Sequence, residues 1–337
     1  MAGELILILQ DFFATGADGT VAAAEPRLPA LETLLATARH RQLGQDWRTE
    51  LAARFGHRLP LEASPARVVA SACLRGACPD GCWLVTPVHY FAGLDSVHLH
   101  PAGLLELTPE MQQVLARDFN RVFADATWRL SVAGGRELLL TGASPAAGGH
   151  DPARSLGARL ESGPAYGTGA ADMRRLSVEV EMWLHAHVLN RQREARGELP
   201  VSGLWAWGAE PMAGLPRNRA AAPGAKQPVL RGTDTFAQAL WRLRGGEAAA
   251  LTGGFGSGGI STAHSDQVVL YPTVARGQGD SALRDFERAW LAPALAALRS
   301  GELAAIELLA GAHSFRLRRL GLARFWRPRA HWREALA

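Results

Sequence analysis

The chain has 337 residues, of which 47% are hydrophobic and 20% are charged. This length allows one large or two medium domains, and the apolar content is enough for a packed core. The low charged fraction and the lack of a long polar tract exclude a largely disordered chain.

The net charge is +4, and the basic residues are almost all arginine, because Lys226 is the one lysine. Together with abundant alanine and glycine, this points to coding bias rather than to nucleic-acid binding. The exception is a basic and aromatic C-terminal segment with Arg316, Arg318, Arg319, Arg324, Phe325, Trp326, Arg327, Arg329, Trp332 and Arg333. Such a segment can contact phosphates or an anionic surface. We expect instead a solvated edge strand with a frayed end, and no nucleic-acid partner.

The first residues, MAGELILILQDFF, contain no basic segment, and their apolar run is too short for a secretion signal. No stretch approaches the roughly 20 apolar residues of a membrane span. We therefore expect a soluble, cytoplasmic protein without a membrane partner.

The first ninety residues alternate between strand and helix patterns. Residues 4–10 (ELILILQ) predict a buried strand, because their apolar run is continuous. Helices are predicted over 28–43, over 46–56 and after Ser64-Pro65, where an N-cap residue precedes a proline. Residues 82–91 predict the next strand, broken at Pro87.

The pattern changes near Asp95. A short strand (VHLHP), a helix from Thr108 to about Phe123 and a hairpin around Ala133-Gly134-Gly135 follow one another. A loop rich in glycine, alanine, serine and proline then extends to about residue 171. These features predict a small α+β subdomain inserted at 95–170.

A long helix is predicted from Asp172, a suitable N-cap, to Gly197, a suitable residue after a helix end. The later elements are a strand at 201–207, a helix from Thr233, a strand at 267–274, a helix at 280–299 and a terminal hairpin. Because strands alternate with helices, we predict an α/β fold with a mainly parallel sheet. Residues 1–90 and 172–337 would form its core.

Three cysteines lie close together, at Cys73, Cys78 and Cys82. Two of them could hold a zinc ion with His89, since thiolates and imidazole suit that metal. The spacing lacks the paired C-x-x-C motifs of zinc sites, so we expect reduced thiols.

The predicted helix 172–197 carries polar residues directly before the strand 201–207. Asn190 and Arg193 lie one turn apart, and an amide next to a guanidinium fork suits a phosphate or a carboxylate. The alternative is that Arg193 only favours the helix C-terminus electrostatically. His89 and His187 are candidate neighbours of this pair, and Trp207 is a candidate pocket floor.

Three segments resemble a known family: VTPVHYFAGLDSVHL, EVEMWLHAHVLNRQREARGELPVSGLWAWG and FERAWLAPALAALRSGEL. They resemble the bacterial RpfE-type regulatory proteins, which are similar to cofactor-independent phosphoglycerate mutase. The resemblance extends over about residues 82–330. Its motif positions are Pro87, Val88, His89, Tyr90, His187, Val188, Leu189, Asn190, Arg193, Gly197, Val201, Ser202, Trp205 and Gly208.

The resemblance implies an alkaline-phosphatase-like, three-layer α/β core with an insert, which agrees with the change near Asp95. It also adds Ser202 to the candidate ligand-binding residues. In archaeal-type mutases of that superfamily, a serine relays a phosphoryl group beside two divalent metal ions.

The chain departs from that chemistry. A two-metal site needs several Asp and His ligands at strand ends, including an Asp-His pair after a late strand. Asp11 does follow the first strand, but His264 and Asp266 precede the strand 267–274. We therefore expect no metal and no other cofactor.

The sequence thus predicts a non-catalytic relative of the mutase, a pseudoenzyme, that binds a phosphate- or carboxylate-bearing small molecule or a regulatory protein partner. The alternative is an active, metal-dependent mutase or phosphotransferase. It would use Mn²⁺ or Zn²⁺ bound by Asp11, His264 and Asp266.

Overall fold

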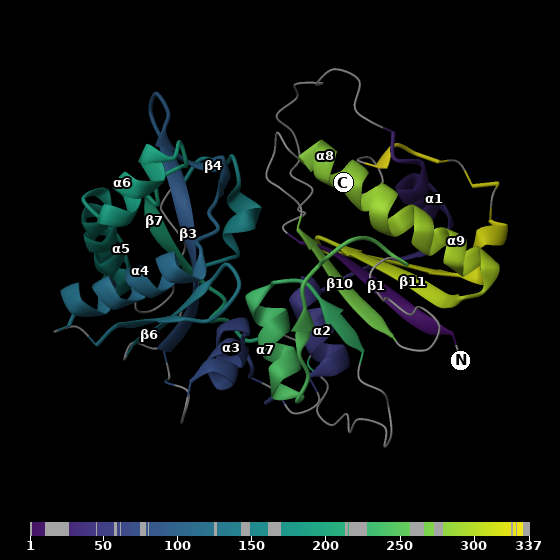
Figure 1. Ribbon diagram of the computed structural model, residues 1–337, viewed down its shortest axis with the longest axis horizontal. Coiled ribbons are helices and arrows are strands. Elements are labelled where there is room, and N and C mark those ends of the chain that lie inside the picture. The colour runs from purple at the N-terminus through teal and green to yellow at the C-terminus, as the bar shows by residue number, and fades with distance from the viewer. Residues whose placement is uncertain are drawn as a thin grey trace. The chain divides into compact units, whose positions relative to one another are not determined.

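The computed structural model of the chain has two compact units (Figure 1). Unit 1 comprises Met1–His57, Asn218–Thr233 and Gly245–Ala337, and unit 2 comprises Arg58–Arg217 and Asp234–Arg244. The structure describes residues 2–10, 27–44, 46–56, 59–60, 62–74, 79, 81–124, 127–142, 149–160, 170–212, 215, 228–256, 266–272, 279–324, 326–327 and 329–332. Within them, no helix has both the length and the apolar composition needed to cross a bilayer.

Unit 1 contains a seven-stranded sheet in the order β2-β12-β11-β1-β10-β8-β9. The strands are β1 (Gly3–Gln10), β2 (Arg39–Gln42), β8 (Val229–Arg231), β9 (Ala248–Ala249), β10 (Gln267–Pro272), β11 (Leu303–Ala310) and β12 (His313–Arg318). The strands from β11 to β9 pair in parallel, whereas β12 and β2 add an antiparallel edge. The predicted α/β fold with a mainly parallel sheet is confirmed.

Helices cover both faces of this sheet (Figure 1). The helices of unit 1 are α1 (Pro29–Thr37), α2 (Trp47–Phe55), α8 (Gly279–Phe286), the π turn η2 (Glu287–Leu291), α9 (Ala292–Ser300) and the 3-10 turn η3 (Arg319–Ala323). Leu5, Leu7 and Leu9 of β1 pack in one apolar cluster with α1, α8 and α9. The residues between them face the other side of the sheet, where Arg54 of α2 hydrogen-bonds to Glu307 of β11. A strand with two covered faces needs a continuous apolar run, as β1 has.

The face covered by α2 contains a buried ion-pair network centred on Glu307 of β11, which is 3% exposed. Arg54 of α2 donates two hydrogen bonds to its carboxylate, of 2.6 and 2.7 Å, and Ser314 donates a third. Arg316 lies 3.2 Å away. Burial alone would raise the pKa of Glu307, but these donors and the two guanidinium charges lower it. The network therefore ties α2 to β11 and β12.

The π turn within the α8–α9 helix has a local cause. Pro293 has no N–H, so the carbonyl of Ala289, four residues earlier, loses its helical partner. That carbonyl instead accepts a hydrogen bond of 2.8 Å from the backbone N–H of Phe255. The approach is close enough that a Cβ on Gly254 would lie 2.3 Å from the Ala289 oxygen. A glycine is therefore required where this loop joins the helix.

Unit 2 contains a five-stranded sheet around the long strand β3 (Gly81–Ala92). Its other strands are β4 (Val97–Leu104), β5 (Arg129–Val132), β6 (Leu138–Gly142) and β7 (Gly203–Trp207). Successive parts of β3 pair with β6, with β7 and with β4, and β5 pairs with β6. All these pairings are antiparallel.

The helices of unit 2 are α3 (Pro65–Cys73), α4 (Pro109–Val122), the 3-10 turn η1 (Pro152–Ser155), α5 (Ala170–His185), α6 (Val188–Ala195) and α7 (Thr235–Leu243). The N-caps Ser64 and Thr108, read from the sequence, accept backbone hydrogen bonds. Phe119 of α4 and Leu176 of α5 pack on Trp83 and Leu140 of the sheet.

Several predictions about the elements were wrong. The strand 201–207 does not join strands 4–10 and 267–274, because β7 pairs with β3 in the sheet of unit 2. Unit 2 therefore extends well beyond the predicted insert at 95–170. A continuous apolar strand buried on both faces has the same pattern in either sheet, so the sequence could not assign it. β3 also continues through Pro87 instead of breaking there.

The predicted helix 172–197 is divided into α5 and α6. His187 has an extended backbone and serves as the N-cap of α6. Asn190 Nδ2 donates a hydrogen bond of 2.8 Å to the carbonyl of Leu184. In a continuous helix the amide of Val188 would take that carbonyl, so Asn190 replaces a backbone hydrogen bond at the break.

Candidate functional site

All six predicted ligand-binding residues lie in unit 2, around the segment Leu199–Gly203 that leads into β7. The segment is held on one side by α6 and on the other by β3. Some of the polar atoms of these residues already form hydrogen bonds within the protein, and others do not. That difference decides which of them can contact a ligand.

Asn190 is fully used by the fold. Its Nδ2 donates to the carbonyls of Leu184 and Val201, and its Oδ1 accepts from the N–H of Val201, each at 2.8 Å. The side chain is buried, with 5% exposed. Both Nδ2 protons are used, so a phosphate or carboxylate could accept a hydrogen bond from Asn190 only if one of these two hydrogen bonds broke.

Arg193 is also directed into the protein. Its Nε donates to the carbonyl of Leu199 at 2.8 Å, and its Nη1 lies 3.1 Å from the Glu198 carboxylate. Burial lowers the pKa of this guanidinium, against the charge of Glu198. Arg193 thus closes the turn between α6 and β7.

His187 is buried at the helix break. Its Nδ1 accepts the N–H of Leu189 at 3.2 Å, so the neutral ring carries its proton on Nε2. Nε2 lies 3.4 Å from Asp118 Oδ2, too far to count as a hydrogen bond. Burial lowers the pKa of His187 although Asp118 favours the charged form. His187 therefore caps a helix in its neutral form.

Trp207 is buried in the sheet, and its Nε1 donates to Thr86 Oγ1 at 2.9 Å. Of the six candidates, the structure brings together only His89 and Ser202 with accessible polar atoms. The Ser202 Oγ lies 3.0 Å from His89 Nδ1. Both side chains are half-buried.

His89 lies where the pairing of β3 with β4 is irregular, between Val88 and Tyr90. Irregular pairing of this kind redirects a side chain from the regular alternation of a strand. His89 Nδ1 is 2.9 Å from the carbonyl of Pro200. A carbonyl only accepts, so the proton of the neutral ring lies on Nδ1 and Nε2 carries a lone pair. Burial lowers the pKa of His89, the Pro200 hydrogen bond opposes this, and the charge of His100 adds to it.

His100 of β4 completes this group, and the sequence had not indicated it. Its ring centroid is 5.5 Å from that of His89. His100 Nδ1 accepts the N–H of Ala102 at 3.0 Å, so its neutral ring donates from Nε2. Phe91, which is exposed, lies against His100 at a centroid distance of 5.7 Å. Two histidines two residues apart in a strand, as in VHLHP, were the available signal.

Of the three predicted metal ligands, the structure describes Asp266. Asp11 and His264 lie outside the described residues, and Asp266 accepts the N–H of Glu4 at the start of β1. Gln10, the residue before Asp11, pairs with Pro272 at the other end of these two parallel strands. Five to six residues of strand separate the two positions, roughly 20 Å. The register thus places Asp266 and Gln10 at opposite ends of the paired strands β10 and β1.

The cysteines do not form a metal site in the described part of the chain. No group of three His, Cys, Asp or Glu residues there is arranged to hold an ion. Cys73 Sγ donates to the carbonyl of Ala133, and Cys82 is buried in β3. Burial raises the pKa of Cys73, although Arg242 opposes it. Cys78 lies outside the described residues.

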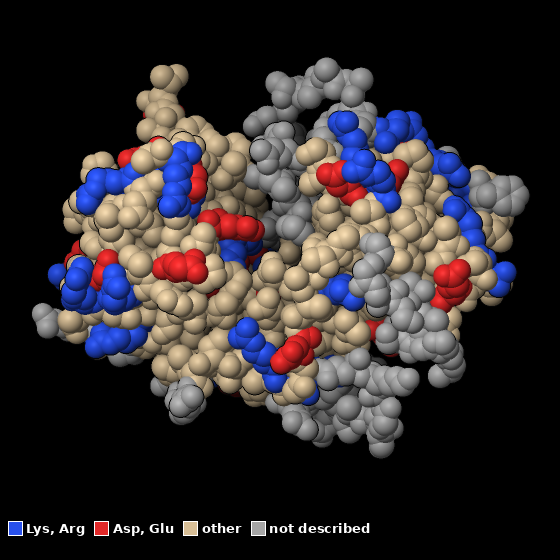
Figure 2. All heavy atoms as spheres, viewed as in Figure 1, with Lys and Arg blue, Asp and Glu red and all other residues tan. Residues whose placement is uncertain are grey.

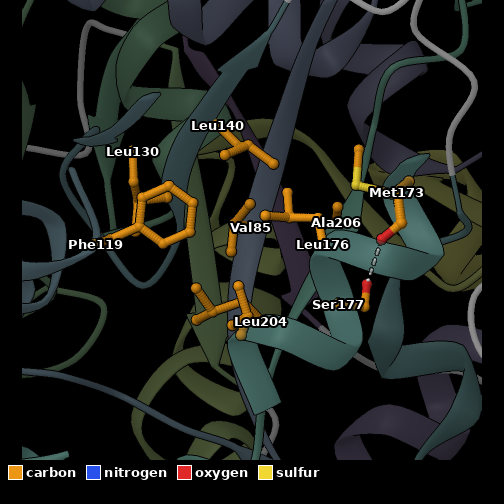
Figure 3. A pocket seen from close by; sticks show the side chains of 10 residues that line it. Val85, Phe119, Leu130, Leu140, Met173, Leu176, Ser177, Leu204 and Ala206 are labelled. Atoms are coloured by element: carbon orange, nitrogen blue, oxygen red, sulfur yellow. Dashed lines mark hydrogen bonds between the residues drawn. The ribbon is translucent and has the colours of Figure 1, made fainter. Parts of the chain in front are cut away.

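A cavity also lies between the sheet of unit 2 and helices α4 and α5 (Figure 3). Its volume is about 20 Å³, and its walls are apolar apart from Ser177, whose hydroxyl donates to the carbonyl of Met173. Ligand pockets usually have several hundred Å³. The cavity is therefore a packing defect of the core and not a ligand site.

Comparisons with known proteins found similar solved structures but no matching family. No family model and no curated protein matches the chain. Among solved structures, it is similar to the cofactor-independent phosphoglycerate mutase from Thermoplasma acidophilum, with 16% identity, a TM-score of 0.39, and 94% of this chain and 89% of that chain covered. It is also similar to the PH0037 protein from Pyrococcus horikoshii, with 12% identity, a TM-score of 0.45, and 94% and 87% covered. Both TM-scores are below 0.5, so these similarities do not establish a family or a function for this chain. The alkaline-phosphatase-like core and the membership of the RpfE-type family therefore stay predictions.

Proposed function

We propose that the chain binds a small phosphate- or carboxylate-bearing molecule at His89, Ser202 and His100, and that it acts as a ligand-binding regulatory protein. The observation that carries the proposal is the fixed tautomer of His89. Because Pro200 holds the Nδ1 proton, Nε2 is the ring atom left for a ligand. The Ser202 hydroxyl lies 3.0 Å from the other ring nitrogen, Nδ1, and the ring of His100, whose centroid is 5.5 Å from that of His89, supplies an Nε2–H.

An anion at this site should bind together with a proton. The charged imidazolium of His89 donates from both nitrogens, so it keeps the Pro200 hydrogen bond and adds one to the ligand. Without ligand, burial lowers the pKa of His89, and the neutral ring prevails at neutral pH. The affinity should therefore rise as the pH falls from about 7.5 towards 5.5, the range in which a histidine gains its charge.

The same geometry argues against an activated serine. A nucleophilic serine needs a base that can accept its proton. The nitrogen of His89 next to Ser202 already carries the proton donated to Pro200. Among the described residues, no carboxylate hydrogen-bonds to His89. The arrangement therefore suits binding and not acyl or phosphoryl transfer through Ser202.

Calorimetric titration of the full chain with inorganic phosphate and with 3-phosphoglycerate tests the proposal. In two buffers with different ionisation enthalpies, the measured heats should reveal proton uptake on binding. His89→Gln should abolish the uptake and weaken binding at least tenfold. His185→Gln, a change at an exposed histidine of α5, should bind like the wild type. Binding by His89→Gln that equals the wild type in affinity and proton uptake would overturn the site.

The alternative remains a metal-dependent mutase or phosphotransferase. It is tested by metal analysis of the purified chain and by mutase and phosphatase assays with added Mn²⁺ or Zn²⁺. Stoichiometric metal together with turnover would overturn the proposal that the chain is a non-catalytic binding protein. It would leave the proton-linked binding at His89 to be judged by the titration alone.

A further inference from the structure

Positively charged residues are concentrated near the C-terminus of this chain. Between Glu307 and Glu334 the sequence has no acidic residue, but it contains Arg316, Arg318, Arg319, Arg324, Arg327, Arg329 and Arg333. These seven arginines exceed the net charge of +4 of the whole chain. In Figure 2, basic side chains gather along the border of unit 1, where the yellow C-terminal segment of Figure 1 runs.

Arg316 differs from the arginines that follow it, because it pairs with Glu307 and Glu4. For the group Arg318, Arg319, Arg324, Arg327 and Arg329, no ion pair with a carboxylate is formed by the residues that the structure describes. Four of these five are exposed, and Arg324 is half-buried. We call this group the arginine patch. Its charge has no internal counterpart in the described structure.

The segment that carries the arginine patch is anchored to the core of unit 1. Leu322 packs against the apolar cluster, and Trp332 is buried in it. Successive backbone hydrogen bonds, from Arg324 to Gly321 and from Arg327 to Arg324, fold the segment into turns. The expectation of a frayed end on an edge strand is thus wrong for the described residues 319–324, 326–327 and 329–332.

Two apolar side chains project from the same turns. Leu320 is 90% exposed, and Trp326 is 68% exposed. Arginines near helix C-termini are stabilised by the helix dipole, which accounts for Arg319 beside Gly301 at the end of α9. That effect does not account for an exposed leucine and tryptophan between unpaired arginines.

We propose that the arginine patch, with Leu320 and Trp326, is a docking surface for an anionic lipid membrane. Basic clusters of four to eight residues are drawn to anionic headgroups, and tryptophan favours the membrane interface. A leucine gains free energy from acyl chains but nothing from nucleic-acid phosphates, so the lipid surface fits this composition better than a nucleic acid. The sequence led us to expect no membrane partner because no segment can span a bilayer. Peripheral binding needs no span.

Co-sedimentation with vesicles tests this surface. The full chain should bind vesicles made of equal parts phosphatidylcholine and phosphatidylserine, and should not bind pure phosphatidylcholine. The triple variant Arg318→Gln, Arg324→Gln, Arg327→Gln should bind roughly a hundredfold more weakly, at about fivefold for each arginine near an anionic surface. The control variant Arg174→Gln, Arg196→Gln, Arg284→Gln removes the same charge from other exposed positions and should bind like the wild type.

A second variant separates lipid from other anionic partners. Leu320→Ser with Trp326→Ser keeps the charge, and it should weaken binding to the mixed vesicles at least tenfold. Failure of the wild type to bind anionic vesicles would overturn the proposal. Equal binding by the arginine triple variant and its control would also overturn it. Salt-sensitive binding of single-stranded RNA, lost in the triple variant and unchanged in Leu320→Ser with Trp326→Ser, would assign the patch to nucleic acid instead.

Discussion

Asn190 provides the sharpest test of how this region is built, because its side chain was first a candidate ligand contact. Replacement by alanine removes hydrogen bonds to the N–H and carbonyl of Val201 and to the carbonyl of Leu184. The carbonyl of Leu184 keeps a hydrogen bond from the N–H of His187, so two groups, the N–H and the carbonyl of Val201, would be left without a partner. A buried polar group without a partner costs roughly 1–3 kcal/mol, so the predicted loss is at least about 2 kcal/mol. Asn190→Ala should therefore destabilise unit 2 severely.

Asn120 supplies a matched control. It brackets Leu130 in the same way, with Nδ2 donating to the carbonyl at 2.8 Å and Oδ1 accepting the N–H at 2.9 Å. Asn120 is half-buried, so water can replace its side chain. Asn120→Ala should cost only about 1 kcal/mol. Asn190→Asp should be at least as harmful as Asn190→Ala at neutral pH, since a carboxylate oxygen would face two carbonyl oxygens.

The assay is urea unfolding in which hydrogen exchange of peptides from unit 2 monitors that unit separately. This is needed because a chain with two units need not unfold in one transition. Peptides spanning Val201 should lose protection first in Asn190→Ala. If the unfolding free energy of Asn190→Ala stays within about 0.5 kcal/mol of the wild type, the value typical of surface sites, then the three hydrogen bonds do not matter as argued. A variant that keeps its stability but loses anion binding would restore Asn190 as a ligand contact.

Four further predictions concern stability. Glu307→Ala should destabilise unit 1 by about 1.5–3 kcal/mol in urea unfolding, because Arg54 and Ser314 lose their hydrogen bonds to the buried carboxylate while Arg54 keeps its ion pair with Glu50. Glu302→Ala, at an exposed site, should change little. Because the folded-state pKa of Glu307 is lowered, its contribution should be present above its unfolded pKa of about 4.3 and lost as the pH falls further; a pH-independent difference between wild type and Glu307→Gln would contradict this. Burial lowers the pKa of His187 in the folded state, so the unfolded chain binds a proton at this residue at higher pH than the folded chain does. The free energy of unfolding should therefore fall as the pH drops below about 6.5. His187→Asn, which can still cap α6, should remove that part of the pH dependence. Gly254→Ala should lower the melting temperature of unit 1, since its Cβ would lie 2.3 Å from the Ala289 oxygen, while Gly44→Ala, with nothing within 4 Å, should not.

Local patterns predicted most of the elements. The apolar run of β1, the N-caps Ser64 and Thr108 and the hairpin of β5 and β6 were read correctly, because each depends on neighbouring residues. The candidate site residues differ in their surroundings. His89 and Ser202 do lie together, but Asn190, Arg193 and His187 turned inward. A sequence shows which residues can hydrogen-bond, but not whether backbone carbonyls already use them.

The amino-acid sequence by itself determined the α/β class, because apolar periodicity and capping act over a few residues and survive without tertiary contacts. Only the tertiary structure decided that β7 pairs with β3 and not with the sheet of β1, since a strand buried on both faces looks the same in either. It also decided that one predicted helix breaks at His187, where Asn190 takes the carbonyl of Leu184. Hydrogen bonds between residues distant in the chain decide which strands pair, which histidine tautomer forms and which polar side chains stay accessible to a ligand. No local sequence pattern contains these hydrogen bonds.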